Sequence, residues 1–301
     1  MAKNIKKRVE VNVSPLLRKL EAITLDLIDT PLLGSYRSIF KGVGLEFDSY
    51  KSYNSSDDAG SIDWKASSRA RQLLVKTYVE ERELNVLFLV DISNSMLFSS
   101  IKKLKNEYAI ELIASLSYAI LESGDNVGIA LFNDDVIKQI YPTKGRTQFY
   151  AIIKELLDPN IYGGGIDLEK AIDFVLGYLK GGSGLVIIVS DFFGLRGDWV
   201  KKLRYLGAKF EVVGMMVRDP RDRTLPDDVG EVMIQDPYSK KSMLIDPKIL
   251  KKKYEDYVKK QEKELKETFM KCRADFISLS TDESFIKYLL AFFRRRKAKW
   301  I

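Results

Sequence analysis

The sequence of 301 residues predicts an α/β protein built on a doubly wound, mostly parallel sheet. From residue 84 onward, short apolar runs alternate with amphipathic segments of helical length, which is the pattern of consecutive strand–helix units. Two of these runs, Val86–Val90 and Leu185–Val189, are almost continuously apolar, as expected for strands that are buried on both faces. In such sheets, ligands bind at the carboxyl ends of the strands. Residues that follow those ends are therefore the first candidates for a functional site.

The sheet domain takes its elements in order from residue 84. Strands are expected at 84–90, 127–132, 136–141, 185–190, 210–217 and 274–279. Helices are expected at about 102–123, 147–157, 167–180, 198–206, 248–271 and 282–297. Gly124 supports the predicted end of the first of these helices, because glycine is typical of a helix C-cap.

Two further regions flank or interrupt this domain. Ser14-Pro15 predicts the start of an N-terminal helix, because a capping residue followed by proline is typical of a first helical turn. Residues 35–83 contain short apolar pieces separated by glycines and a polar loop, and they predict a small β region. Four prolines and two β-like pieces predict a β-hairpin insertion at about 218–247.

We therefore divide the chain into residues 1–83, an N-terminal helix with a small β region, and residues 84–301, the sheet domain with its insertion. No stretch rich in proline, glycine and serine separates Val75 from Val90. Because flexible linkers have that composition, we expect the small β region to dock on the sheet domain.

Composition excludes several kinds of chemistry. The chain has no histidine, so imidazole metal sites and Ser-His-Asp or Cys-His nucleophile systems are excluded. Its single cysteine, Cys272, excludes an intramolecular disulfide and a zinc site built from several thiolates. Chemistry must therefore come from oxygen ligands, from lysine and arginine, from backbone dipoles, or from binding alone.

The moderate excess of positive charge does not by itself indicate a nucleic-acid-binding protein. Lysine and arginine number 49 against 42 acidic residues, and basic residues cluster at both ends of the sequence. Such clusters are typical of solvated termini, and a nucleic-acid site there would show salt-sensitive binding. No apolar run approaches the length of about 20 residues that a membrane span needs, and no secretory signal is visible. We expect a cytoplasmic protein.

Polar side chains follow two of the predicted strands. Asp91, Ser93 and Ser95 come directly after the first apolar run, and Asp191 follows the strand that ends at Ser190. Alternate spacing along a loop can turn one carboxylate and two hydroxyls toward one point. Hard oxygen ligands suit Mg²⁺. The plainer alternative is that the serines cap the next segment while Asp91 accepts hydrogen bonds from backbone amides.

The string Asp91-Ile92-Ser93-Asn94-Ser95-Met96 resembles the metal-ion-dependent adhesion site of von Willebrand factor A domains. Further strings resemble one bacterial and archaeal branch of these proteins, the family catalogued as domain of unknown function fifty-eight. These strings are Gly42-Val43-Gly44-Leu45-Glu46-Phe47, Asp57-Asp58, Ile62-Asp63-Trp64, Ser67-Ser68-Arg69, Val75-Lys76, Glu80-Glu81-Arg82, Asp219-Pro220 and Leu225-Pro226. The resemblance runs from about residue 34 to the C-terminus.

The resemblance implies a von Willebrand factor A-like fold, a Mg²⁺ site at Asp91, Ser93, Ser95 and Asp191, and association with a MoxR-type AAA+ ATPase. The chain departs from the family pattern at two places. Ser56-Asp57-Asp58 replaces the usual Gly-Asp-Asp, and Ile166 stands where the resemblance places a threonine ligand. Asp167 or Thr147 would have to substitute for that threonine, or the site is weak.

The resemblance further implies a non-enzymatic adaptor that helps the ATPase to assemble other proteins or to insert their metals. In this hypothesis, the bound Mg²⁺ keeps one position open for an aspartate or glutamate of the partner. The alternative is a Mg²⁺-dependent phosphohydrolase that uses Asp91 as nucleophile or metal ligand.

A polar and aromatic group precedes the sheet domain. Asp63, Trp64 and Arg69 could form a structural clamp between the small β region and the sheet domain, because arginine pairs with carboxylates and tryptophan can cover the pair. The alternative for these three residues is a partner-binding surface.

Overall fold

The computed structural model describes residues 45–54, 57–80, 84–180, 184–227 and 229–298. The expected N-terminal helix from Ser14 and the glycine-containing string at 42–44 lie outside the described residues. In the described part, no helix has both the length and the apolar character required to cross a membrane.

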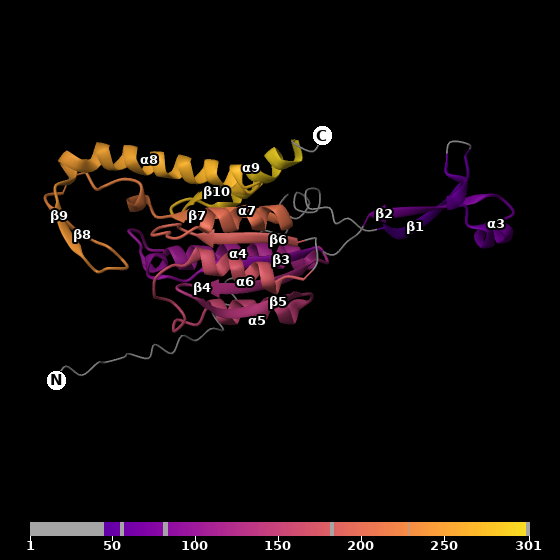
Figure 1. The fold of residues 1–301 in the computed structure, drawn as a ribbon, viewed down its shortest axis with the longest axis horizontal. Coiled ribbons are helices and arrows are strands. Elements are labelled where there is room, and N and C mark those ends of the chain that lie inside the picture. Colours follow the sequence, from indigo (N-terminus) through magenta and orange to yellow (C-terminus); the bar gives the residue numbers. More distant parts are fainter. Residues whose placement is uncertain (1–44, 55–56, 81–83, 181–183, 228, 299–301) are drawn as a thin grey trace.

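A six-stranded sheet forms the main body, with the strand order β10-β7-β6-β3-β4-β5. Five strands are parallel, and β5 runs antiparallel to β4 at one edge. The strands are β3 (Asn85–Asp91), β4 (Asn126–Phe132), β5 (Val136–Thr143), β6 (Gly184–Ser190), β7 (Glu211–Arg218) and β10 (Asp275–Ser280). The predicted fold class is confirmed (Figure 1).

Helices cover both faces of this sheet. One face packs against α4 (Lys105–Glu122), α5 (Arg146–Leu156) and α9 (Phe285–Ala298). The other face packs against α6 (Leu168–Tyr178), α7 (Trp199–Lys209) and the C-terminal part of α8 (Pro247–Lys271). The central strand β3 contributes side chains to the apolar cores on both faces of the sheet. Phe88 belongs to the first core and its neighbour Leu87 to the second. This two-sided burial explains the continuous apolar run in the sequence.

The first helix of the sheet domain begins later than expected. A short 3-10 helix, η2 (Asn94–Leu97), follows β3, and α4 begins only at Lys105. The side chain of Glu107 accepts a hydrogen bond from the backbone N–H of Leu104 at 2.9 Å, which satisfies one amide at the start of the helix. A 3-10 turn and a loop therefore separate β3 from α4.

The predicted hairpin insertion is present. It consists of β8 (Val232–Gln235) and β9 (Ser242–Ile245), which pair antiparallel with each other and form a sheet of their own. Figure 1 shows the hairpin at one end of the main body, next to the start of α8.

A small unit precedes the sheet domain. Its two strands, β1 (Leu45–Ser52) and β2 (Leu74–Glu80), pair antiparallel. Between them lie a 3-10 turn, η1 (Ala59–Ser61), and a short helix, α3 (Trp64–Ala70), that the sequence analysis did not predict. Figure 1 draws this unit apart from the main sheet. The structure therefore gives no support to the expected docking.

Candidate functional site

The candidate site lies where neighbouring strands send their helices to opposite faces of the sheet. The chain leaves β3 toward α4 on one face, whereas it leaves the adjacent β6 toward α7 on the other face. Such a switch point opens a crevice at the carboxyl edge of a parallel sheet. Val90 of β3 is paired in register with Val189 of β6, so Asp91 and Asp191 both follow at this crevice.

The loop after β3 brings the predicted carboxylate and hydroxyls together. Asp91 Oδ1 accepts a hydrogen bond from the backbone N–H of Ser93 at 2.8 Å, and Asp91 Oδ2 accepts one from the hydroxyl of Ser190 at 2.6 Å. The hydroxyl oxygens of Ser93 and Ser95 are 3.2 Å apart. Ile92, which alternates with these polar residues, is fully buried in the core. Alternate spacing therefore produces the convergence that the sequence predicted.

Asp91 is a buried carboxylate without a counter-cation in the described part of the chain. Its side chain belongs to a residue that is 1% exposed, and none of the described ion pairs includes it. Burial, followed by the nearby charge of Asp191, raises the pKa of Asp91 to about 7. The site therefore favours either a proton or a cation at this carboxylate.

Asp191 has a different environment, which the sequence analysis missed. The ammonium of Lys105 lies 2.6 Å from Asp191 Oδ2 and 3.0 Å from Asp222 Oδ2, and Lys105 is 1% exposed. The other oxygen, Asp191 Oδ1, accepts the backbone N–H of Phe193 at 2.9 Å. A lysine rather than an ion therefore compensates Asp191. Helical spacing could have identified Lys105 as a buried residue. It stands three residues before the buried Tyr108 and therefore lies on the same inner face of α4.

The loop 163–165 lies against the Asp91 loop. The backbone N–H of Gly163 donates to Ile92 O at 2.8 Å, and that of Asn94 donates to Gly164 O at 3.1 Å. The next two residues do not join the serines. Ile166 packs against the second apolar core, and Asp167 caps α6 by accepting the backbone N–H of Lys170 at 2.9 Å.

The other residue considered as a substitute ligand is also placed elsewhere. Thr147 is an exposed residue in the first turn of α5. The structure thus brings Asp91, Ser93 and Ser95 together and places Asp191 beside them, while Asp167 and Thr147 serve other parts of the fold.

These donors fit a weakly held Mg²⁺. Asp91 supplies a carboxylate with no ammonium or guanidinium partner among the described residues, and Ser93 and Ser95 supply two adjacent hydroxyls. Against this, Lys105 already neutralises Asp191, and no group of three or more acidic, histidine or cysteine side chains suited to a metal occurs in the described ranges. Mg²⁺ usually keeps several waters, which would complete the shell formed by one carboxylate and two hydroxyls.

A second missed residue comes from the hairpin insertion. The hydroxyl of Tyr238, in the turn between β8 and β9, lies 2.9 Å from Ser95 Oγ and 3.3 Å from Ser93 Oγ. Nothing in the sequence placed this turn at the carboxyl edge, because the contact joins residues more than 140 positions apart.

The residues of the expected clamp lie in the small unit. Asp63 caps α3 by accepting the backbone N–H groups of Lys65 and Ala66, both at 3.0 Å, and it pairs with Lys76 at 3.0 Å. These contacts lower the pKa of Asp63, the hydrogen bond from Ala66 having the largest effect. Trp64, 69% exposed, and Arg69, also exposed, lie on the surface. The described contacts of this group thus stay within the small unit and do not form a clamp.

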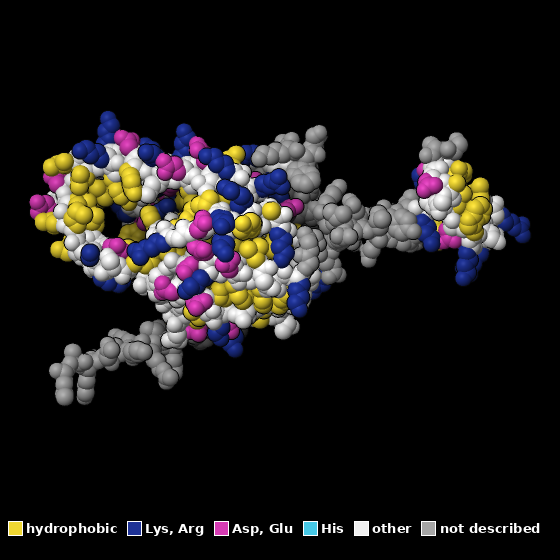
Figure 2. All heavy atoms as spheres, viewed as in Figure 1, with side chains coloured by type: hydrophobic (Ala, Val, Ile, Leu, Met, Phe, Trp, Pro, Cys, Tyr) yellow, Lys and Arg dark blue, Asp and Glu magenta, His cyan; other side chains and the backbone are white. Residues whose placement is uncertain are grey.

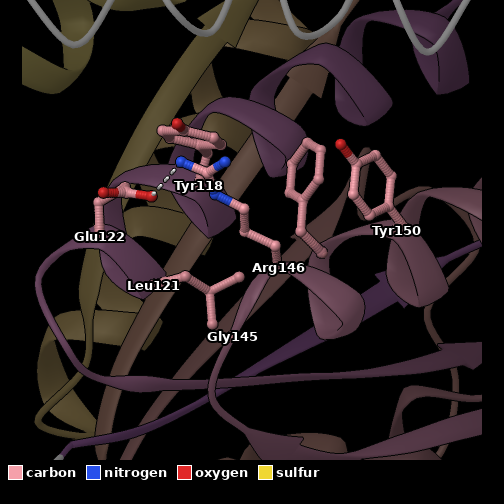
Figure 3. A pocket seen from close by; sticks show the side chains of 7 residues that line it. Tyr118, Leu121, Glu122, Gly145, Arg146 and Tyr150 are labelled. Carbon is pink, nitrogen blue, oxygen red and sulfur yellow. Dashed lines mark ion pairs between the residues drawn. The ribbon is translucent and has the colours of Figure 1, made fainter.

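A separate surface hollow lies at the far end of α4. Its volume is about 290 Å³, and aromatic residues form much of its wall. Figure 3 shows Tyr118, Arg146 and Tyr150 around it, with an ion pair between Arg146 and Glu122. The hollow is at the end of α4 opposite to Lys105, so it is not part of the site at Asp91.

One solved structure supports this architecture. A crystal structure of an aerotolerance-related membrane protein from Bacteroides fragilis is similar with a TM-score of 0.50 and 17% identity, covering 70% of this chain and 99% of that one. A von Willebrand factor type A structure from Catenulispora acidiphila has a TM-score of 0.34 and 14% identity, covering 48% of this chain and 35% of that one.

Sequence comparison gives the family. An uncharacterized protein of Mycobacterium tuberculosis is 28% identical over 285 residues, which cover 93% of this chain and 89% of that protein. The family model described as "Protein of unknown function DUF58" matches residues 49–264, which include most of the small unit and the site at Asp91. The main domain shares its doubly wound α/β fold with the Bacteroides fragilis structure, and the chain belongs to the DUF58 family.

Proposed function

We propose that this protein is an interaction module that binds a protein partner at the carboxyl edge of its sheet, around Asp91, Ser93 and Ser95. The partner we propose is a MoxR-type AAA+ ATPase, for which the chain acts as an adaptor during the assembly of other proteins or of their metal centres. The observation that carries the proposal is Asp91, a buried carboxylate beside two hydroxyls and without a counter-cation among the described residues.

In this proposal, Asp91, Ser93 and Ser95 would hold Mg²⁺, which supplies an open position for a carboxylate of the partner. Neighbouring residues hold the two acidic side chains at this edge of the sheet in place. Ser190 donates to Asp91 and fixes the carboxylate, while Lys105 fixes Asp191 and with it the loop after β6. Because both supports are buried, the edge is rigid before the partner arrives, which lowers the entropic cost of binding.

The test is calorimetry between the full chain and the MoxR-type ATPase encoded in the same genome. We expect binding at millimolar Mg²⁺, loss of binding in EDTA, and loss of binding in Asp91→Ala. Asp173→Ala is the matched control, because Asp173 is an exposed acidic residue of α6 that pairs with Lys202 away from the site. Equal binding by wild type and Asp91→Ala would contradict the proposal.

The phosphohydrolase alternative requires a reactive Asp91. Both oxygens of this carboxylate already accept hydrogen bonds, from Ser93 and Ser190, and the lysine nearest the site, Lys105, is paired with two carboxylates. We therefore favour binding over catalysis. A colorimetric phosphatase screen with Mg²⁺ and Mn²⁺ tests the alternative, which predicts turnover that disappears in Asp91→Asn.

A further inference from the structure

The hairpin insertion reaches into the candidate site with one side chain. Tyr238 places its hydroxyl 2.9 Å from Ser95 Oγ, 3.3 Å from Ser93 Oγ and 3.2 Å from the backbone oxygen of Phe193. The phenol oxygen thus contacts the same two hydroxyls that would hold Mg²⁺ in the proposed function. Phe193 belongs to the loop after Asp191, so Tyr238 spans both loops of the crevice.

The fold provides a fitted position for this ring. Gly194 adopts a φ of +72°, and a Cβ at this position would lie 2.7 Å from a carbon of the Tyr238 ring. Any larger residue at position 194 would therefore displace the ring. On the hairpin, Asp236 Oδ1 accepts the backbone N–H of Tyr238 at 2.8 Å, which orders the turn that carries the tyrosine.

Few other side chains of the hairpin are covered. Between residues 233 and 244, Pro237 and Tyr238 are half-buried and the remaining residues are exposed. Met233 is 71% exposed and Met243 is 62% exposed, and Figure 2 shows hydrophobic side chains gathered on this part of the molecule. Tyr238 is therefore the main polar contact between the hairpin tip and the sheet domain, and the exposed apolar side chains would resist opening only weakly.

We propose that the β8–β9 hairpin is an autoinhibitory lid, in which Tyr238 covers Ser93 and Ser95, the hydroxyls that would hold Mg²⁺ for the partner's carboxylate, until the partner displaces it. This inference rests on the proposed function, because it assigns the regulation of the same site.

The chemistry of the phenol supports a lid rather than a permanent ligand. A tyrosine side chain is a neutral phenol at physiological pH. A neutral phenol can exchange hydrogen bonds with Ser95, but it offers a cation none of the negative charge that a carboxylate brings. A partner's carboxylate therefore has an advantage over Tyr238 when a cation is present.

The test measures access to the site without any ligand. In Ser95→Cys, the new thiol takes the position that Tyr238 covers, and the native Cys272 is buried and gives a low background. We expect iodoacetamide to label Ser95→Cys/Tyr238→Ala at least about tenfold faster than Ser95→Cys. Tyr257→Ala in the same background is the control, because Tyr257 is an exposed tyrosine of α8. Equal labelling with and without Tyr238 would overturn the lid.

The second part of the test measures how tightly Tyr238 variants bind the MoxR-type ATPase. Tyr238→Phe keeps the ring in its slot and removes the hydroxyl, so this variant guards against misfolding of the hairpin. We expect both Tyr238→Phe and Tyr238→Ala to bind the ATPase more tightly than wild type, by about tenfold for the loss of one or two hydrogen bonds. Faster labelling with no ATPase binding by any variant would support the lid and contradict the proposed function. Unchanged labelling would overturn the lid whatever the ATPase does.

Discussion

The ammonium of Lys105 lies 2.6 Å from Oδ2 of Asp191, and both residues are at most 1% exposed. This buried pair separates the two acidic residues of the candidate site into different roles. Asp191 is neutralised from within the fold, whereas Asp91 has no such partner in the described part of the chain. The central strands thus end in one carboxylate that is paired with a buried lysine and one that has no cationic partner among the described residues.

Replacing Lys105 tests how much its buried ion pairs contribute to stability. Lys105→Met leaves two carboxylates, those of Asp191 and Asp222, without their buried cation. We expect the free energy of unfolding to fall by about 3–5 kcal/mol, because the cost of an uncompensated buried charge is large. Urea denaturation measures the change. Lys102→Met, at an exposed lysine of the preceding loop, should leave stability within about 0.5 kcal/mol of wild type. Equal effects of the two variants would contradict the role of Lys105.

Asp91 predicts a pH dependence of stability. Its pKa is raised from 3.8 to about 7, so between these values the folded chain holds a proton that the unfolded chain has released. This contribution to stability is complete below pH 3.8 and is lost as the pH rises toward 7, at roughly 1.4 kcal/mol per pH unit. Asp191 and Tyr238 face the same crevice, and both are unchanged when wild type is compared with a variant of Asp91.

The measurement is urea denaturation of wild type and Asp91→Asn between pH 5 and pH 8, in EDTA so that no divalent ion contributes. We expect the variant to lose less stability than wild type over this range, because asparagine does not titrate. Parallel pH profiles for the two proteins would show that Asp91 ionises normally in the folded state.

The small unit gives a paired prediction. Asp63 accepts three hydrogen bonds and pairs with Lys76, whereas Arg69 is exposed. Asp63→Ala should therefore accelerate amide hydrogen exchange in α3 and β2, while Arg69→Ala should leave it unchanged. Exchange in the six-stranded sheet should be unaffected by either change. A loss of stability in Arg69→Ala would instead restore the clamp that the sequence analysis expected.

Replacing Ile166 tests whether the threonine ligand of the family pattern can be restored. Ile166→Thr introduces a hydroxyl at the position where the family resemblance places a ligand. Because Ile166 packs against the second apolar core, we expect the change to destabilise the fold by about 1 kcal/mol. If the new hydroxyl reaches the site, Mg²⁺ should bind more tightly in calorimetry than in wild type. Failure to detect Mg²⁺ binding in either protein would leave recognition by shape and charge alone.

Sequence periodicity predicted the sheet domain well because its strands are buried on both faces and its helices are amphipathic. The same local signals predicted that Asp91, Ser93 and Ser95 lie close together, since their proximity depends on one loop, and their role as metal ligands stays a prediction. The missed residues depend on contacts across the fold. Lys105 reaches a residue 86 positions away, and Tyr238 reaches Ser95 from an insertion whose orientation no local pattern determines.

The short helix α3 was missed for a different reason. It has only seven residues, Trp64–Ala70, which is too short for a helical period to emerge. Its N-cap, Asp63, was singled out for its charge and its aromatic neighbour instead of for its position before a helix.

Binding of a MoxR-type ATPase at the Asp91 edge is tested most directly by an amide hydrogen-exchange footprint of that ATPase on this chain. We expect protection at residues 91–98 and 190–194, together with faster exchange in the hairpin turn at 236–241 as Tyr238 leaves the serines. Protection at the opposite end of α4, around the hollow formed by Tyr118 and Tyr150, with no change at Asp91 would contradict it.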